Sequence, residues 1–452
     1  MATFDKKAPG VYVEEISKLP PSVASVATAI PGFVGYTERG TRNTAIRVES
    51  LIDFEEKFGY ACKIAISDEE DKINGLEYKL HESMRLFYAN GGGTCYVVSV
   101  GNYTDAISNT ALETGISMLE PIDEVTMIVV PDAVSLEIED LASVQNAALA
   151  QCLELKDRVA ILDVKDTGNC NTDATNFRNS IGTKGASYGA AYYPYIKSVY
   201  DREINVYDIY KGLELSNQEL ENAQYYAELS EPTEESTLFA KQLMSKPEYA
   251  KLVAKIQEQA NLLPPSGAIA GIYCANDNQR GVWHAPANMS VSGISDINVR
   301  ISDKQQGELN EDTSGKCINA IRAFQGKGIL VWGARTLDGL SSEWKYISVR
   351  RFFNYVEESI QESTAWAVFQ PNDANTWVKV RCQIENFLSN LWRDGALAGS
   401  TPQEAFYVRV GINQTMTAQD ILNGYMIVEI GMAAVRPAEF IVLQFSHKLQ
   451  ES

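Results

Sequence analysis

Short apolar runs alternate with helix-like segments along the middle of the chain, and this alternation limits the possible folds more than any other feature. The runs at 125–132, 159–164 and 188–194 are separated by helix-like segments at 137–156 and 173–182. Strands that are apolar at successive positions are buried on both faces, as in a parallel sheet covered by helices on both sides. The sequence therefore predicts an α/β fold.

More elements are predicted on both sides of this region. The predicted strands are 30–36, 95–100, 328–333, 405–410 and 426–430, and the predicted helices are 76–90, 348–369 and 374–394. Residues 200–262 break the alternation, because they carry 12 acidic and 6 basic residues and no strand-like run after Tyr210. We interpret them as an acidic surface insertion with a helix near 236–261. Residues 303–315 are polar and predict a loop.

Both ends of the chain contain a short strand-like segment that cannot form a sheet alone. Near the N-terminus the segment is followed by Pro20 and Pro21, which favour an extended linker. An isolated strand must pair with a sheet, in its own chain or in a neighbour. The residues that we expect to pair are Val11, Tyr12, Val13 and Ile16 at the N-terminus, and Phe440, Ile441, Val442, Leu443 and Phe445 at the C-terminus.

The pattern predicts a multi-domain chain of mixed α/β (α+β) class. Its predicted parts are an N-terminal arm and linker (1–22), the N-terminal part of the body (23–100), an α/β outer domain with the insertion (101–335), a C-terminal domain (336–438) and a C-terminal arm (439–452).

Charge excludes several classes of partner. The net charge is −20, and 13 basic and 13 acidic residues follow from Lys316 onward, so the acidic excess lies in the first 315 residues. Such a chain is a poor ligand for nucleic acid or anionic lipid. No apolar run approaches the length that spans a bilayer. Residues 1–7 contain no apolar region, so we expect no signal peptide. Seven cysteines without CxxC spacing predict reduced thiols in a protein made in the cytoplasm.

The residues that could carry catalysis are few. His81, His284 and His447 are far apart and have no second ligand at metal-binding spacing, so we expect no metal site. The glycines of 91–93 follow a helix and precede a strand, whereas phosphate-binding loops follow a strand. We expect no cofactor and no enzymatic activity. The alternative is a hydrolase on an α/β scaffold that uses Asp163 and His284.

Several segments together resemble the contractile tail sheath proteins. The first segments are 9–15, Pro20-Pro21 and 28–35, followed by Phe87-Tyr88-Ala89-Asn90-Gly91-Gly92 before a strand. Two more are Gly281-Val282-Trp283-His284-Ala285-Pro286-Ala287-Asn288 and the segment from Asn319 to Thr336. The chain from Tyr346 to Phe445 resembles the C-terminal domain of the family nearly throughout. The insertion at 200–262 has no counterpart that we can place.

The resemblance implies a structural subunit that polymerises helically around an inner tube and contracts to drive the tube through a target envelope. It implies an inner domain built from both chain ends and an outer domain, with terminal arms that add strands to sheets of neighbouring subunits. The implied partners are copies of itself, sheath paralogues, the inner tube protein, the baseplate and the tail terminator or cap. The particle would be a phage tail or a phage-tail-like injection system made in a bacterium.

Contacts with the inner tube are a further part of this prediction. Basic residues of the C-terminal domain are candidates because that domain is neutral while the rest is acidic. They are Lys345, Arg350, Arg351, Lys379 and Arg381, and the alternative is that they are ordinary surface residues. A static shell or surface-layer subunit is a second alternative function. It would share the exchanged arms but have a single lattice.

Overall fold

The computed structural model describes residues 23–66, 73–229 and 233–440. These residues fall into two compact units. The first, which we call the body, contains Val26–Glu357 and residues 435–440. The second, which we call the C-terminal unit, contains Glu358–Ala434 and residues 23–25.

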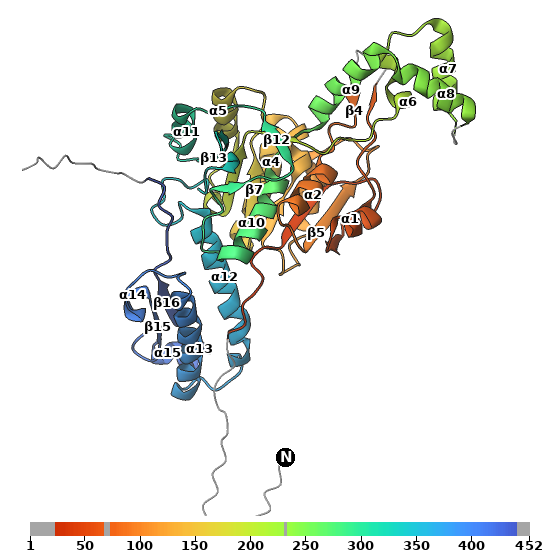
Figure 1. Ribbon diagram of the computed structural model, residues 1–452. Helices are drawn as coiled ribbons and strands as arrows, with labels where there is room; N and C mark the ends of the chain where they lie inside the picture. Colours follow the sequence, from red (N-terminus) through yellow and green to blue (C-terminus); the bar gives the residue numbers. More distant parts are fainter. Residues whose placement is uncertain (1–22, 67–72, 230–232, 441–452) are drawn as a thin grey trace, which may run out of the picture. The chain divides into compact units, whose positions relative to one another are not determined.

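A nine-stranded sheet runs through the body (Figure 1). Its order is β11-β14-β13-β8-β7-β6-β1-β5-β2. The strands from β13 to β5 are parallel, and β14, β11 and β2 are antiparallel to their neighbours. The strands are β1 (Pro31–Tyr36), β2 (Ala45–Val48), β5 (Cys95–Gly101), β6 (Met127–Val129), β7 (Val159–Asp163), β8 (Gly189–Tyr193), β11 (Met289–Ser290), β13 (Ile318–Phe324) and β14 (Gly328–Val331).

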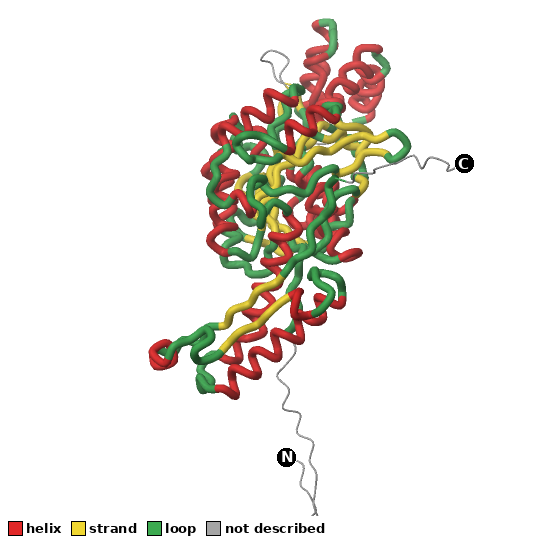
Figure 2. Tube along the Cα trace, turned by 90° about the vertical axis from the view of Figure 1, so that its left-hand side faces the viewer, coloured by secondary structure: helices red, strands yellow, loops and turns green. Residues whose placement is uncertain are grey.

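Helices cover both faces of this sheet (Figure 2). Val159 and Ile161 of β7 belong to the core that contains α2 and α10, whereas Ala160 and Leu162 belong to the opposite core with α3 and α4. This burial on two sides explains why successive strand residues are apolar, and the predicted α/β class is confirmed. The helices are α1 (Leu51–Phe58), α2 (Leu80–Ala89), α3 (Asn109–Ser117), α4 (Ile138–Leu155), α5 (Cys170–Ser180), α10 (Ser266–Arg280) and α11 (Asp303–Asn310).

The acidic insertion leaves the body after β9 (Ile196–Ser198) and returns at β10 (Leu262–Leu263). These two strands are antiparallel neighbours, and with β12 (Ile294–Ile297) they form a small sheet. Between them lie α6 (Val206–Ile209), α7 (Asn217–Ala227), α8 (Glu234–Met244) and α9 (Pro247–Ala260). The insertion has its own small core, which contains Val206, Tyr210, Leu213, Ala223, Phe239 and Leu243.

A buried ion pair fixes the base of the insertion on the body. The Arg202 Nε lies 2.5 Å from a carboxylate oxygen of Glu82 on α2, and both side chains are almost fully buried. The remaining guanidinium nitrogens of Arg202 donate to the carbonyls of Gly75 and Tyr78. Ile209 and Ile256 of the insertion also pack against Ile64 beside the short hairpin of β3 (Ala65–Ile66) and β4 (Ile73–Asn74).

The C-terminal unit is a two-stranded sheet backed by helices. The helix α12 (Ile347–Thr364) begins in the body and ends in this unit. The elements that follow are α13 (Ala374–Arg393), α14 (Pro402–Ala405), β15 (Phe406–Val410), α15 (Ala418–Leu422) and β16 (Val428–Met432). The apolar stripe of α13 is buried, and the helix ends before Gly395, whose φ of +84° is suited to glycine.

The structure differs from the sequence prediction in three places. The single helix predicted near 236–261 is two helices, because Pro247 begins α9 where no backbone N–H is needed. The loop predicted at 303–315 contains α11, which starts at a capping box between Ser302 and Gln305. Residues 23–100 and 101–335, which the sequence analysis separated, contribute strands to one sheet.

Within the described ranges, no helix combines the length and apolar character needed to cross a membrane. Nor do the described residues bring three or more histidine, cysteine, aspartate or glutamate side chains together in a way that could hold a metal ion. All seven cysteines are free thiols.

The Arg202–Glu82 pair gives a first test of this architecture. Replacing Glu82 by Gln leaves a buried guanidinium without its countercharge, so we expect the free energy of unfolding to fall by about 3–5 kcal/mol. Urea denaturation of subunits kept unassembled at low concentration measures this change. The matched control is Glu308→Gln, which breaks an exposed pair with Lys304 and should change stability by about 0.5 kcal/mol or less. Equal effects of the two variants would contradict the role given to Arg202.

Candidate assembly site

The sheet of the C-terminal unit has one apolar and one polar face. Phe406, Val408 and Val410 of β15 are buried, whereas Tyr407 and Arg409 are exposed. On the polar face the Tyr407 hydroxyl donates to Glu429 of β16 at 2.8 Å, and the Arg409 guanidinium lies 4.5 Å from the centre of the Tyr407 ring. The alternation is that of a sheet with one face on a core and one in solvent.

This sheet is unfinished along its edges. In the described part of the chain, β15 and β16 pair only with each other, in the register Phe406↔Met432 to Val410↔Val428. A two-stranded sheet is marginal in water, and each strand presents a row of unpaired peptide groups along its outer edge. The ladder can therefore accept at least one more strand.

An apolar groove of about 760 Å³ lies beside β16 within the C-terminal unit. Its floor and walls come from β16, from α13 and from the end of α12 with the loop that follows. The lining residues are Ile360, Thr364, Ala367, Val368, Phe369, Gln370, Pro371, Asn372, Thr376, Val380, Ile384, Gly424, Met426, Val428 and Ile430. Alternate residues of β16 line it, so an added strand could bury alternate side chains in it while its backbone extends the ladder.

The rim of the groove carries unusually exposed apolar side chains. Phe369 is fully exposed and has a φ of +64°, a conformation that is rare for an aromatic residue. Val368 beside it is also exposed. Such side chains in the lining of a groove are typical of an interaction surface.

Most of the predicted arm residues lie outside the described residues. This applies to Val11, Tyr12, Val13 and Ile16, and to Ile441, Val442, Leu443 and Phe445. Phe440 is described, and its side chain is 72% exposed. The root of the N-terminal arm is also described, where the Ala24 backbone N–H donates to the Ser363 hydroxyl in the C-terminal unit.

The structure separates the five basic residues predicted to contact a tube into two groups. Arg350 and Arg351 are buried in the body. Arg351 forms a bidentate pair with Asp277, with distances of 2.6 and 3.0 Å, and Arg350 stacks 4.0 Å from the centre of the Trp344 ring. Both guanidinium groups therefore have their partners inside the subunit, which does not fit a contact with a tube.

The other three basic residues have solvent-accessible side chains. Lys379 on α13 is exposed. Arg381 on the same helix is 40% exposed and lies near Glu385, and Lys345 lies partly exposed beside the Tyr346 ring. The prediction of a tube contact therefore rests on Lys345, Lys379 and Arg381.

The crevice that enzymes of this topology use for ligands is filled by the chain itself. The parallel strands β5-β1-β6-β7-β8 follow a doubly wound order whose switch point lies between β1 and β6. There, the buried carboxylate of Asp132 accepts hydrogen bonds from the backbone N–H groups of Tyr36, Lys79 and Leu80. Burial raises the pKa of Asp132 to about 6, although these three hydrogen bonds lower it.

The residues of the hydrolase alternative are not brought together. Asp163, at the end of β7, accepts a hydrogen bond from the Ser266 backbone at the start of α10. His284 follows the other end of this helix, which has 15 residues and is therefore about 22 Å long. Asp163 is buried, whereas His284 is exposed.

Comparison with known proteins gives the identity of the fold. Residues 102–337 match the family model of the phage tail sheath protein central domain, and residues 341–448 match that of the phage tail sheath C-terminal domain. The chain belongs to the phage tail sheath family. The resemblance seen in the sequence is thereby confirmed.

Solved sheath structures match the whole chain. The sheath complex of an extracellular contractile injection system, PVC, in its contracted state is 31% identical, with a TM-score of 0.69 and 99% of both chains covered. The helical sheath of the anti-feeding prophage in its contracted state is 30% identical, with a TM-score of 0.66, and the match covers 97% of this chain and 99% of that one.

Among curated proteins, the tail sheath protein of Vibrio phage KVP40 is 23% identical over 193 residues, which are 42% of this chain. The match spans only 27% of that relative's length. The two sheath proteins of injection systems, in contrast, match from end to end, so the acidic insertion that sequence patterns left unplaced falls within the matched length.

The buried carboxylate of Asp163, at the end of β7, offers a pH test of this part of the structure. Burial raises the pKa of Asp163 to about 7, against an ordinary value of 3.8. The folded chain therefore holds this proton more tightly than the unfolded chain, and the contribution of Asp163 to stability falls as the pH rises from about 4 through 7. We expect Asp163→Asn to stabilise the subunit by about 1–3 kcal/mol at pH 8 and by less at pH 5, measured by urea denaturation.

The control is Asp303→Asn, whose side chain is 95% exposed and lies 2.8 Å from the Arg322 guanidinium. It should show no such difference between the two pH values. A stabilisation by Asp163→Asn that is equal at pH 5 and pH 8 would contradict the raised pKa.

Proposed function

We propose that the chain is the repeating subunit of a contractile sheath, which polymerises helically around an inner tube and shortens to drive that tube through a target envelope. The observation that carries this proposal is the open ladder of β16 beside an apolar groove. Family membership supports it, and so does the match of the whole chain to sheaths solved in the contracted state.

Strand addition would link the subunits. An arm from a neighbouring subunit, either the N-terminal segment with Val11 and Val13 or the C-terminal segment with Ile441 and Leu443, would pair with the free edge and place alternate side chains in the groove. Such a contact joins two different surfaces, so it does not close after two subunits and builds a helical array.

Contraction in this scheme uses no nucleotide. The arms keep the subunits joined while the bodies change their contacts, and small gains at many interfaces add along the array. The extended lattice is then metastable and the contracted lattice is the stable one. The role is structural, and no enzymatic step belongs to it.

The proposed partners are other copies of the chain, sheath paralogues, the baseplate, a terminator or cap, and the inner tube. One solved relative with 31% identity is described as part of the baseplate of the anti-feeding prophage, which supports the baseplate contact. Lys345, Lys379 and Arg381 are the proposed tube contacts. The subunit would be made in the bacterial cytoplasm and act as part of a phage tail or phage-tail-like particle.

A static shell subunit is the remaining alternative. It would use the same open edge but form a single lattice. Electron microscopy separates the two functions, because a contractile sheath shows an extended and a shortened helical form with different diameters. A single lattice before and after triggering would favour the shell.

Deletion of residues 1–20 tests the proposed strand exchange. We expect the deletion to abolish polymers while the subunit still folds, because the arm is needed between subunits and not within one. Negative-stain electron microscopy counts the polymers, and circular dichroism with thermal melting checks the fold. Long polymers formed by the shortened chain would contradict the exchange of the N-terminal arm.

A substitution in the groove tests the acceptor side. Ile430→Gln places a polar group where an incoming side chain would be buried, so we expect at least a tenfold loss of polymer at a fixed concentration. The control is Leu422→Gln on α15, which replaces a 79% exposed side chain that does not line the groove. Equal loss of polymer for both variants, or none for Ile430→Gln, would contradict the groove as the acceptor.

A further inference from the structure

The chain crosses between the two units three times, after residues 25, 357 and 434, and its last crossing ends in a charged anchor. It leaves the body along α12, builds the C-terminal unit, and returns to the body at Val435. Four residues later, Glu439 docks on the body through Arg335, which follows β14. The anchor therefore lies at the root of the C-terminal arm.

The contact between Glu439 and Arg335 is bidentate and partly buried. The Arg335 Nε lies 2.9 Å from one carboxylate oxygen and its Nη2 lies 2.6 Å from the other. The hydroxyl of Tyr346 donates to the same carboxylate at 3.0 Å. The Arg335 side chain is 1% exposed and that of Glu439 is 20% exposed. Bidentate pairs of this kind are strong and fix direction as well as distance.

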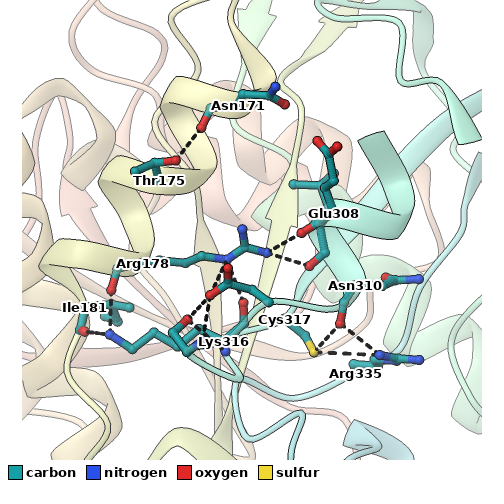
Figure 3. A network of polar contacts seen from close by, with 12 residues as sticks. Asn171, Thr175, Arg178, Ile181, Glu308, Asn310, Lys316, Cys317 and Arg335 are labelled. Atoms are coloured by element: carbon teal, nitrogen blue, oxygen red, sulfur yellow. Dashed lines mark hydrogen bonds and ion pairs between the residues drawn. The ribbon is translucent and has the colours of Figure 1, made fainter. Parts of the chain in front are cut away.

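Arg335 is itself held in a rigid frame. Its backbone N–H donates to the Asn319 side chain at 2.7 Å, and its Nη1 donates to the carbonyl of Asn310 at the end of α11. Cys317 donates to the same carbonyl (Figure 3). The guanidinium therefore has little freedom to follow Glu439 if the arm moves.

Hydrogen bonds of Arg178 and Lys316 connect this frame to α5. Arg178 donates to the carbonyls of Glu308, Leu309 and Lys316, and the Lys316 ammonium donates to the carbonyls of Arg178 and Ile181 (Figure 3). These hydrogen bonds connect the ends of α5 and α11 with the start of β13, close to Arg335.

Only the side chain of Glu439 is covered at this point of the chain. Residues 438–440 are exposed as whole residues, with Phe440 at 72%, whereas the Glu439 side chain is 20% exposed. Hydrogen bonds from Arg335 and Tyr346 lower the pKa of Glu439 despite its burial, so the carboxylate stays charged below the ordinary range of a glutamate. The anchor therefore lies at the first residue of the predicted C-terminal arm, 439–452.

We propose that Glu439 is a positioning residue for assembly. Held by Arg335 and Tyr346, it fixes where the C-terminal arm leaves the body, and it transmits the force that a neighbouring subunit exerts on the arm to the sheet of the body. Without this contact, the force would act directly on β16, which is held by a single strand. The inference rests on the proposed function, because it assumes that the arm binds another subunit.

The test uses Glu439→Gln in the full-length chain, which removes the charge and keeps the shape. In the unassembled subunit we expect hydrogen exchange of residues 433–440 to rise at least tenfold, with exchange in β7 and α10 unchanged. We also expect the critical concentration for polymerisation to rise at least fivefold. Glu439→Asp, which keeps the charge, should restore most of both losses, and Tyr346→Phe should show a smaller effect of the same sign.

The matched control is Glu258→Gln, which breaks a pair with Lys197 on the acidic insertion, where the Glu258 side chain is 73% exposed. It should change neither measurement. Unchanged exchange at 433–440 in Glu439→Gln would overturn the anchor, and raised exchange with unchanged polymerisation would overturn its role in assembly. Deletion of residues 441–452 distinguishes the two proposals, because normal polymers after that deletion would contradict the C-terminal arm exchange itself.

Discussion

Pairing of backbone peptide groups decides which part of this chain is complete by itself and which part needs a neighbour. In the body, nine strands share one sheet, and its two edges are the short strands β2 and β11, of four and two residues. Short edge strands offer little to a foreign chain. The C-terminal unit has the opposite character, since five residues of β16 present an open edge beside an apolar groove. We therefore propose the edge of β16 as the place where a neighbouring subunit binds.

The same sheet shows how a fold shared with many enzymes can serve a structural role. Doubly wound sheets bind ligands at the switch point because helix N-termini and strand ends leave backbone N–H groups there. In this chain Asp132 satisfies three such groups with its own carboxylate. The site is occupied from within, and the residues that might have formed a hydrolase lie at opposite ends of α10. A fold that many enzymes use for ligand binding therefore has no open site at its switch point here, because a carboxylate of the chain itself takes up the free backbone N–H groups.

Much of the fold could be predicted from the sequence because strand and helix patterns are local. The strands β1, β5, β7 and β8 and the long helices α4 and α13 lie within a few residues of their predicted positions. The missed helix α11 is polar, and only its capping box between Ser302 and Gln305 could have indicated it. Residue roles were harder to predict, since they depend on partners distant in sequence. Arg351 is neutralised by Asp277, 74 positions away, and Arg335 by Glu439, 104 positions away. Charge patterns along the chain give no sign of such pairs.

The path of the acidic insertion has a practical consequence for engineering. Because β9 and β10 are adjacent antiparallel strands, the chain enters and leaves the insertion at neighbouring points, a geometry that tolerates exchange of the intervening segment. A foreign domain with closely spaced termini could replace residues 203–261, provided that it covers Ile64 and Ile66, against which α9 now packs. A particle built from such subunits would carry one copy of the added domain for every subunit, at a spacing set by the lattice.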